Sequence, residues 1–149
     1  MTTLKQIESF VTLQPIAMVG VSRNKKKFGY IAFNELKEKG MNIIPVNRNA
    51  DEINNIKAYP DVMALPPEVK GLIVMTPKHE TTGVIRDAVK KGFKHIWIQQ
   101  FSDSKETLGE LNNTDINYIT GQCILMFYKP HGIHKFHGKL KKFFGRYPK

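Results

Sequence analysis

Short apolar runs alternate with amphipathic stretches along most of this chain. A run that is apolar at nearly every position is typical of a strand buried on both faces of a parallel sheet. The predicted strands are residues 16–21, 41–46, 71–75, 94–98 and 117–119, and residues 121–126 extend or follow the last of them. A further short extended piece is expected at 56–59, after a polar loop at 47–55.

Between these runs the apolar residues recur with helical spacing. Thr3 and Gln6 have the spacing of a capping box at the start of the first predicted helix. Gly40 and Gly92 suit helix C-termini, and Ser104 suits an N-cap. The predicted helices are residues 3–13, 30–39, 79–91, 105–112 and 133–144.

Alternating strands and helices predict right-handed βαβ crossovers. We therefore expect an α/β fold: a Rossmann-like, doubly wound parallel sheet in a three-layer α/β/α arrangement, with a basic C-terminal helix. The length of 149 residues fits one domain, 1–149, in which residues 129–149 form a helical appendage.

Ligands of such sheets bind at the carboxyl ends of the strands. Gly20 ends the first predicted strand, a polar loop with three lysines at 25–27 follows, and Gly29 opens a helical pattern. Glycines let backbone N–H groups approach an anion, and a helix N-terminus adds partial positive charge. This arrangement predicts a site for a phosphorylated ligand.

The residues favour some nucleotides over others. The dinucleotide fingerprint of three closely spaced glycines is absent, and the second predicted strand ends at Asn47 and Arg48 instead of an acid. A guanidinium group suits a phosphorylated ribose. The residues therefore favour coenzyme A or NADP over NAD, unless Asn47 and Arg48 merely form a turn.

The chain is basic, with 23 Lys and Arg against 13 Asp and Glu and a net charge of +10. A solvated surface, a polyanionic small ligand or a nucleic acid would each account for this charge. Many of the basic residues lie in the C-terminal segment, which is a candidate contact for an acidic protein partner, a membrane surface or a nucleic acid. No nucleic-acid-reading motif accompanies it, so nucleic acid is the less favoured partner.

No apolar run is long enough to span a bilayer, and the N-terminus does not resemble a signal peptide. Cys123 is the single cysteine, so no internal disulfide is expected, and a small buried residue is its default role. These features together predict a cytoplasmic protein without a membrane span.

Catalytic and metal-binding patterns are weak. No Gly-x-Ser-x-Gly elbow is present, and Ser22 is expected to bind phosphate or cap a helix. His131, His134 and His137 invite a zinc hypothesis, but no acid follows Asp115, and lysines repel a cation there. We expect no enzymatic activity and no metal; an NADP-binding oxidoreductase subunit is the enzymatic alternative.

An ordered series of short motifs resembles the small bacterial CoA-binding proteins, stand-alone relatives of the CoA-binding domain of the succinyl-CoA synthetase alpha subunit. The motifs are residues 16–22 (IAMVGVS), 27–30 (KFGY), 44–47 (IPVN), 57–60 (KAYP), 74–77 (VMTP), 96–99 (IWIQ) and 121–126 (GQCILM). The resemblance implies a Rossmann-type fold that binds the phosphoadenosine and pyrophosphate part of coenzyme A or an acyl-CoA. The phosphohistidine of the synthetase lies in a second domain that this chain does not contain, so that activity is not implied.

The resemblance also implies roles for particular residues. The phosphate loop would be Gly20, Val21, Ser22 and Arg23, flanked by Lys27 and Tyr30; the ribose and its phosphate would lie near Asn47 and Arg48; the adenine wall would be Thr76 and Pro77; and Gln99 and Gln100 would close the site. Many relatives read Gln-Pro-Gly-Ala where this chain has Gln99, Gln100, Phe101 and Ser102. We expect that departure to change the shape of the loop and to place Phe101 either on the ligand or in the pocket.

Overall fold

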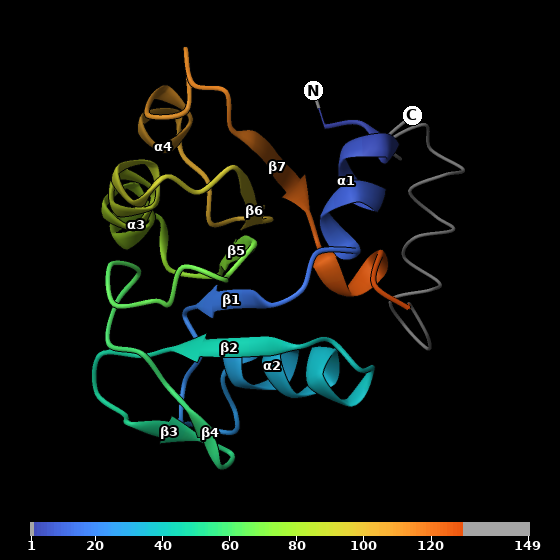
Figure 1. The fold of residues 1–149 in the computed structure, drawn as a ribbon, viewed down its shortest axis with the longest axis vertical. Helices are drawn as coiled ribbons and strands as arrows, with labels where there is room; N and C mark the ends of the chain where they lie inside the picture. The colour runs from blue at the N-terminus through green and yellow to red at the C-terminus, as the bar shows by residue number, and fades with distance from the viewer. Residues whose placement is uncertain (1, 130–149) are drawn as a thin grey trace.

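A five-stranded parallel sheet forms the centre of the protein in a computed structural model, which describes residues 2–129 (Figure 1). The strand order is β2-β1-β5-β6-β7, and all four pairings are parallel. The strands are β1 (Ile16–Val19), β2 (Ile43–Val46), β5 (Gly71–Val74), β6 (His95–Gln99) and β7 (Asn117–Gln122). The predicted α/β Rossmann-like fold is confirmed.

Helices cover both faces of this sheet (Figure 1). They are α1 (Leu4–Val11), α2 (Phe28–Glu38), α3 (Lys78–Lys91) and α4 (Lys105–Gly109), with a 3₁₀ turn, η1 (Ile124–Met126). The capping box of Thr3 and Gln6 starts α1, and the Ser104 side chain caps α4, as expected. Each capping side chain satisfies a backbone N–H that the helix itself leaves without a partner.

Two hydrophobic cores result from the alternation of side chains along the strands. In β1, Ile16 and Met18 pack with α1, α2 and η1 on one face, whereas Ala17 and Val19 pack with α3 on the other. Trp97 is fully buried in the first core, with its ring 5.5 Å from that of Phe10. Burial on both faces explains why the strands are nearly continuous apolar runs.

Three local predictions differ from the structure. The predicted loop at 47–55 contains β3 (Glu52–Ile53), which pairs with β4 (Ile56–Lys57) in an antiparallel hairpin. Asn54 and Asn55 form its turn with φ of 52° and 61°, and asparagine tolerates this left-handed region. Helix α2 begins at Phe28 rather than Tyr30. Residues 124–126 form η1 instead of strand.

The predicted helix at 133–144, the appendage from 129 onward and the histidines at 131, 134 and 137 lie almost wholly outside the described residues. Within residues 2–129, no helix has the length and apolarity needed to cross a membrane. Cys123 is buried, as predicted for a small core residue.

Candidate functional site

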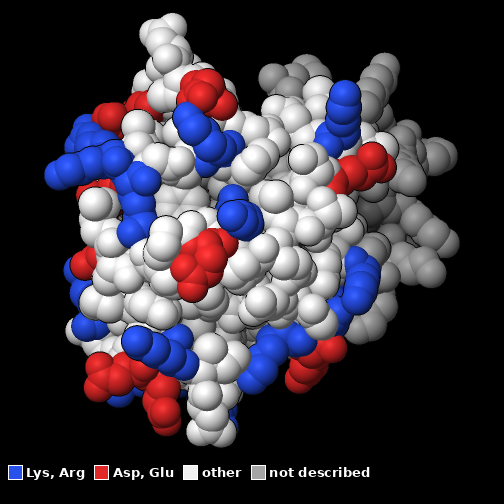
Figure 2. Space-filling model, in the orientation of Figure 1, with Lys and Arg blue, Asp and Glu red and all other residues white. Residues whose placement is uncertain are grey.

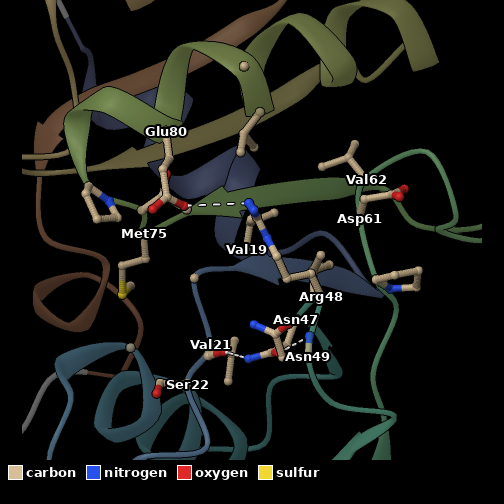
Figure 3. A pocket seen from close by; sticks show the side chains of 18 of the residues that line it. Val19, Val21, Ser22, Asn47, Arg48, Asn49, Asp61, Val62, Met75 and Glu80 are labelled. Carbon is tan, nitrogen blue, oxygen red and sulfur yellow. Dashed lines mark hydrogen bonds and ion pairs between the residues drawn. The ribbon is translucent and has the colours of Figure 1, made fainter.

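A cleft of about 1140 Å³ lies at the carboxyl edge of the sheet (Figure 3). We call it the edge cleft. The ends of three adjacent strands line it, namely those of β2, β1 and β5, together with the starts of α2 and α3 and the loop after β4. Eight of the twelve predicted site residues line it: Gly20, Val21, Ser22, Lys27, Asn47, Arg48, Thr76 and Pro77.

Two glycines bring the backbone segments of the cleft together. A Cβ on Gly29 would lie 2.1 Å from the carbonyl oxygen of Gly20, and a Cβ on Gly20 would lie 2.4 Å from that of Met75. Gly20 also has φ of 95°, a conformation that glycine adopts readily. The β1–α2 turn therefore packs against both α2 and the end of β5, and a side chain at either glycine would push them apart.

The N-terminus of α2 opens into the edge cleft. Lys27 is its N-cap and makes no side-chain capping bond, and Phe28 and Gly29 are its first two residues. Ser22 Oγ accepts a 3.0 Å hydrogen bond from the Asn24 N–H, which shapes the loop before the helix. Backbone N–H groups, the helix dipole and the lysine together make this end of the cleft suitable for a phosphate.

Asn47 joins the end of β2 to the β1–α2 turn. Its Nδ2 donates a 2.7 Å hydrogen bond to the Val21 carbonyl, and its Oδ1 accepts one of 2.8 Å from the Asn49 N–H (Figure 3). Both polar ends of the side chain thus have partners within the protein. Asn47 lies beside the predicted ribose site, and its observed contacts hold the two loops in position.

Arg48 follows Asn47 and extends across the edge cleft toward α3. Its guanidinium lies 3.8 Å from a carboxylate oxygen of Glu80, and their side chains are 74% and 43% exposed (Figure 3). An exposed ion pair of this length contributes little stability, so the arginine is available to a competing phosphate. This geometry is the one expected of an arginine that leaves Glu80 to bind a phosphate of the ligand.

One wall of the cleft was missing from the sequence prediction. Helix α3 contributes His79, Glu80, Gly83, Val84, Arg86 and Asp87, and the loop after β4 contributes Pro60, Asp61 and Val62. Positions three or four apart share one face of a helix, and α3 starts at the carboxyl end of β5. The three- and four-residue spacing of these α3 side chains could have indicated that they share one helix face. It could not have indicated that this face of α3 lines the cleft.

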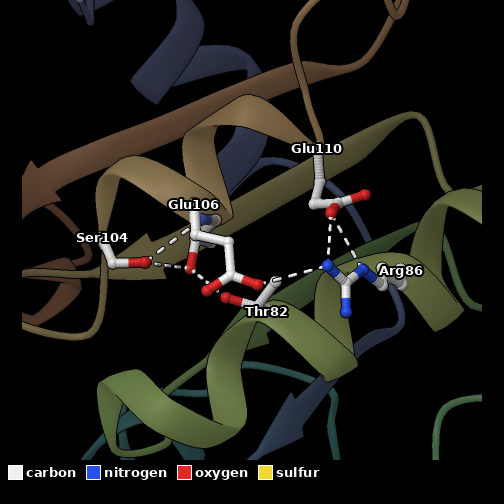
Figure 4. Close-up of polar contacts among 6 residues, drawn as sticks. Thr82, Arg86, Ser104, Glu106 and Glu110 are labelled. Atoms are coloured by element: carbon white, nitrogen blue, oxygen red, sulfur yellow. Dashed lines mark hydrogen bonds and ion pairs between the residues drawn. The ribbon is translucent and has the colours of Figure 1, made fainter.

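Polar contacts fasten α3 to α4 (Figure 4). Arg86 donates hydrogen bonds to Glu110 at 2.8 Å and to Glu106 at 3.2 Å. The bond and charge of Glu110 raise the pKa of Arg86 above its ordinary value. Beneath them, Thr82 and Thr107 share a buried hydrogen bond of 2.9 Å. The α3 wall is therefore supported from behind, and Arg86 is engaged with two carboxylates.

Thr76 and Pro77 form the turn from β5 into α3. The Thr76 hydroxyl is buried and lies 2.8 Å from that of Thr81, and the Pro77 carbonyl accepts a bond from the same threonine. Pro77 is the N-cap of α3 and is exposed. The predicted adenine wall is thus a rigid corner with an exposed proline ring.

Four predicted site residues lie outside the lining of the edge cleft. Arg23 is exposed on the β1–α2 turn. Tyr30 donates a 3.1 Å hydrogen bond to Asn54 in the β3–β4 hairpin, and side-chain hydrogen bonding with Asn34 and then Asn54 lowers the pKa of its hydroxyl. Gln99 is buried, and its Oε1 accepts a bond from the Ile124 N–H.

Gln99 and Gln100 instead line a second cavity of about 390 Å³, which shares Phe28 and Met75 with the edge cleft. The chain turns there through a hydrogen bond of 2.9 Å from the Ser102 N–H to the Gln99 carbonyl. Phe101 occupies the third position of this turn with φ of 72°.

A left-handed third position defines the type II turn that a Pro-Gly pair favours. The turn at 99–102 thus has a form that suits a Pro-Gly pair, and phenylalanine takes the position that suits glycine. The expected change of loop shape relative to the Gln-Pro-Gly-Ala relatives stays a prediction. Phe101 is 80% exposed, so it does not plug the edge cleft.

Basic and acidic side chains are interspersed over the described part of the face in Figure 2. Blue and red groups alternate there without one continuous basic patch. In the edge cleft itself, Lys27, Arg48 and Arg86 are accompanied by Asp61 and Asp87, as well as by the Glu80 partner of Arg48. The cleft thus combines local cationic groups with carboxylates, which suits a ligand that has both phosphates and hydrogen-bond donors.

A family model described as a CoA binding domain matches residues 14–129. The chain belongs to this CoA-binding domain family. The matched residues include every predicted site residue, and the family assignment indicated by the sequence motifs is confirmed. Membership supports coenzyme A binding by this chain.

Curated relatives of this CoA-binding domain include two ligase chains. The alpha subunit of ADP-forming acetate–CoA ligase II from Pyrococcus furiosus is 34% identical over 93 residues, which are 62% of this chain. ADP-forming acetate–CoA ligase II from Archaeoglobus fulgidus is 30% identical over 138 residues, or 90% of this chain. The chain spans about a fifth of the length of these relatives.

Solved structures show the same fold. A conserved hypothetical protein from Pyrococcus furiosus is 37% identical with a TM-score of 0.71, over 74% of this chain and 95% of that one. A dinucleotide-forming acetyl-coenzyme A synthetase 1 from Ca. Korarchaeum cryptofilum, in complex with phosphate and ADP, is 26% identical with a TM-score of 0.62. The match covers 70% of this chain and 25% of the synthetase chain.

Proposed function

We propose that this protein binds coenzyme A or an acyl-CoA in the edge cleft, as a binding or regulatory module without catalytic activity of its own. The observation that carries the proposal is the cleft that joins the α2 N-terminus to Arg48. The first suits a diphosphate and the second suits a phosphorylated ribose, as coenzyme A requires. Family membership supports the same ligand.

The non-catalytic part of the proposal has separate support. Ser22 Oγ accepts a hydrogen bond from the backbone of its own loop, a local turn contact rather than a nucleophile–base pair. The ligase relatives are about five times longer than their matched part, so the activity in their names is not evidence that this part is catalytic by itself. Hydrolysis or transfer of the acyl group of an added acyl-CoA by the purified protein would overturn this part.

Ligand identity is tested first by thermal shift with coenzyme A, dephospho-CoA, NADP and NAD. A ligand at ~100 times its dissociation constant stabilises the fold by about 2.7 kcal/mol. We expect a shift with coenzyme A and a smaller one with dephospho-CoA. A shift with NADP and none with coenzyme A would replace the proposal with the oxidoreductase alternative. Mass spectrometry of ligand retained by the native protein gives an independent answer.

The role of Arg48 is tested by calorimetric titration of Arg48→Ala. Loss of a charge-assisted contact to phosphate is expected to weaken coenzyme A binding by about tenfold. Binding of dephospho-CoA, which lacks the ribose phosphate, should change little. Arg23→Ala is the matched control, because Arg23 is an exposed arginine outside the cleft. The ribose-phosphate role would be rejected if Arg48→Ala lost the same affinity for coenzyme A and for dephospho-CoA. It would also be rejected if Arg23→Ala lost as much affinity for coenzyme A as Arg48→Ala.

A further inference from the structure

The second cavity described above lies beside the edge cleft, toward β6. Arg48 follows β2, whereas the turn at 99–102 follows β6, and β1 and β5 lie between them in the sheet. Phe28 and Met75 line both spaces, so the two are contiguous at the α2 N-terminus. We call the second space the apolar cavity.

Among residues 2–129, the lining of the apolar cavity carries no charged side chain. It consists of Phe28, Met75, Gln99, Gln100, Phe101 and Ser102. Two aromatic rings and a thioether provide apolar surface, and the Oε1 of Gln99 already accepts a hydrogen bond from the backbone of η1. Its volume of about 390 Å³ lies within the usual range for small-molecule pockets. The lining therefore suits a neutral, apolar group.

Phe101 is the unusual residue of this cavity. A bulky side chain with φ of 72° is strained, and an 80% exposed ring gains little from burial to offset that strain. Phe28 in the same lining is also 48% exposed. Strained residues cluster at ligand sites, and two exposed rings around one cavity are a surface that a ligand would cover.

We propose that the apolar cavity binds the acyl group of an acyl-CoA, so that the protein prefers thioesters of short apolar acids to free coenzyme A. The inference rests on the proposed function. With the diphosphate at the α2 N-terminus and the phosphorylated ribose at Arg48, the remaining arm of the ligand extends toward β6. The cavity that Phe28 and Phe101 line lies in that direction, and we assign it to the acyl group beyond the thioester.

The test compares calorimetric affinities for coenzyme A, acetyl-CoA, butyryl-CoA and succinyl-CoA. Burial of one methylene strengthens binding by up to about fourfold, so two methylenes in a partly open cavity should make butyryl-CoA about fivefold tighter than acetyl-CoA. Succinyl-CoA has the same carbon chain length as butyryl-CoA but ends in a carboxylate. Succinyl-CoA is expected to bind no more tightly than acetyl-CoA, because the cavity would desolvate its unpaired carboxylate.

Phe101→Asn is the decisive variant. Asparagine tolerates a positive φ, so the turn should be retained while the ring is removed. The preference for butyryl-CoA should fall to about twofold or less, with coenzyme A binding unchanged. Ile31→Ala is the matched control, because Ile31 on α2 is 48% exposed, like Phe28, but lines neither space.

The outcomes separate the two proposals. If coenzyme A binds but butyryl-CoA binds no tighter than acetyl-CoA, the acyl assignment is overturned and the proposed function stands. If Phe101→Asn lowers the affinities for coenzyme A and butyryl-CoA by the same factor, the cavity binds the arm before the thioester. That result also overturns the acyl assignment. If none of the four ligands binds, the proposed function fails, and the acyl assignment fails with it.

Discussion

Replacing Gly29 by alanine tests the backbone contact that shapes the proposed phosphate site. Alanine is normally the better helix former by up to about 1 kcal/mol. Here the added methyl carbon would lie 2.1 Å from the Gly20 carbonyl oxygen and 3.2 Å from its carbonyl carbon, and both are backbone atoms. Overpacking of this kind costs about 1–3 kcal/mol, and the severe overlap favours the upper end. We expect Gly29→Ala to lower the free energy of unfolding by about 2 kcal/mol.

Gly83 on α3 offers a matched control, because a methyl group there would meet no described neighbour within 4 Å. Gly83→Ala should raise the free energy of unfolding by up to about 1 kcal/mol, so the two variants should differ by about 3 kcal/mol. Equilibrium urea denaturation without ligand measures both, since a chain of this size usually unfolds in two states. If Gly29→Ala is as stable as Gly83→Ala, the close approach of the turn to α2 is refuted.

Two further substitutions test the cleft and the core. Glu80→Gln removes the carboxylate partner of Arg48, so coenzyme A binding should strengthen by about two- to fivefold at low salt and less at high salt in calorimetry; weaker binding would mean that Glu80 itself contacts the ligand. Phe10→Ala should lower the free energy of unfolding by about 3–5 kcal/mol in urea, because the ring is fully buried against Trp97. Phe101→Ala is its exposed counterpart, and a loss of similar size there would contradict the burial argument.

Much of the fold could be predicted from local pattern. The strands of the large sheet are nearly continuous apolar runs, and burial on both faces produces that pattern wherever helices cover a parallel sheet. The β3–β4 hairpin was missed because each of its strands has only two residues, too few to show a period. The start of α2 was placed two residues late because Gly29 does not look like a helical residue.

The candidate site was predictable in outline but not in its contacts. The residue types of the glycine loop predicted a phosphate site, and Arg48 at the end of the second strand predicted a contact with a phosphorylated ribose. The structure brings both into one cleft. The wall formed by α3 was missed because its residues are distant in the sequence from those of the glycine loop and β2. Arg48 and Glu80, for example, come together only in the folded protein. The choice of helix face depends on which strands are neighbours, and a local pattern does not contain that information.

The sequence by itself determined the order along the chain of the helices and of the strands in the large sheet, the glycines at turns and close contacts, and the family to which the chain belongs. Only the tertiary structure decided which polar groups are already engaged. The amides of Asn47 and Gln99 bond to backbone 26 and 25 residues away, whereas Arg48 has, among residues 2–129, only an exposed pair. Residue type sets what a side chain is able to bind, but the partners that folding brings to it decide what it has left for a ligand.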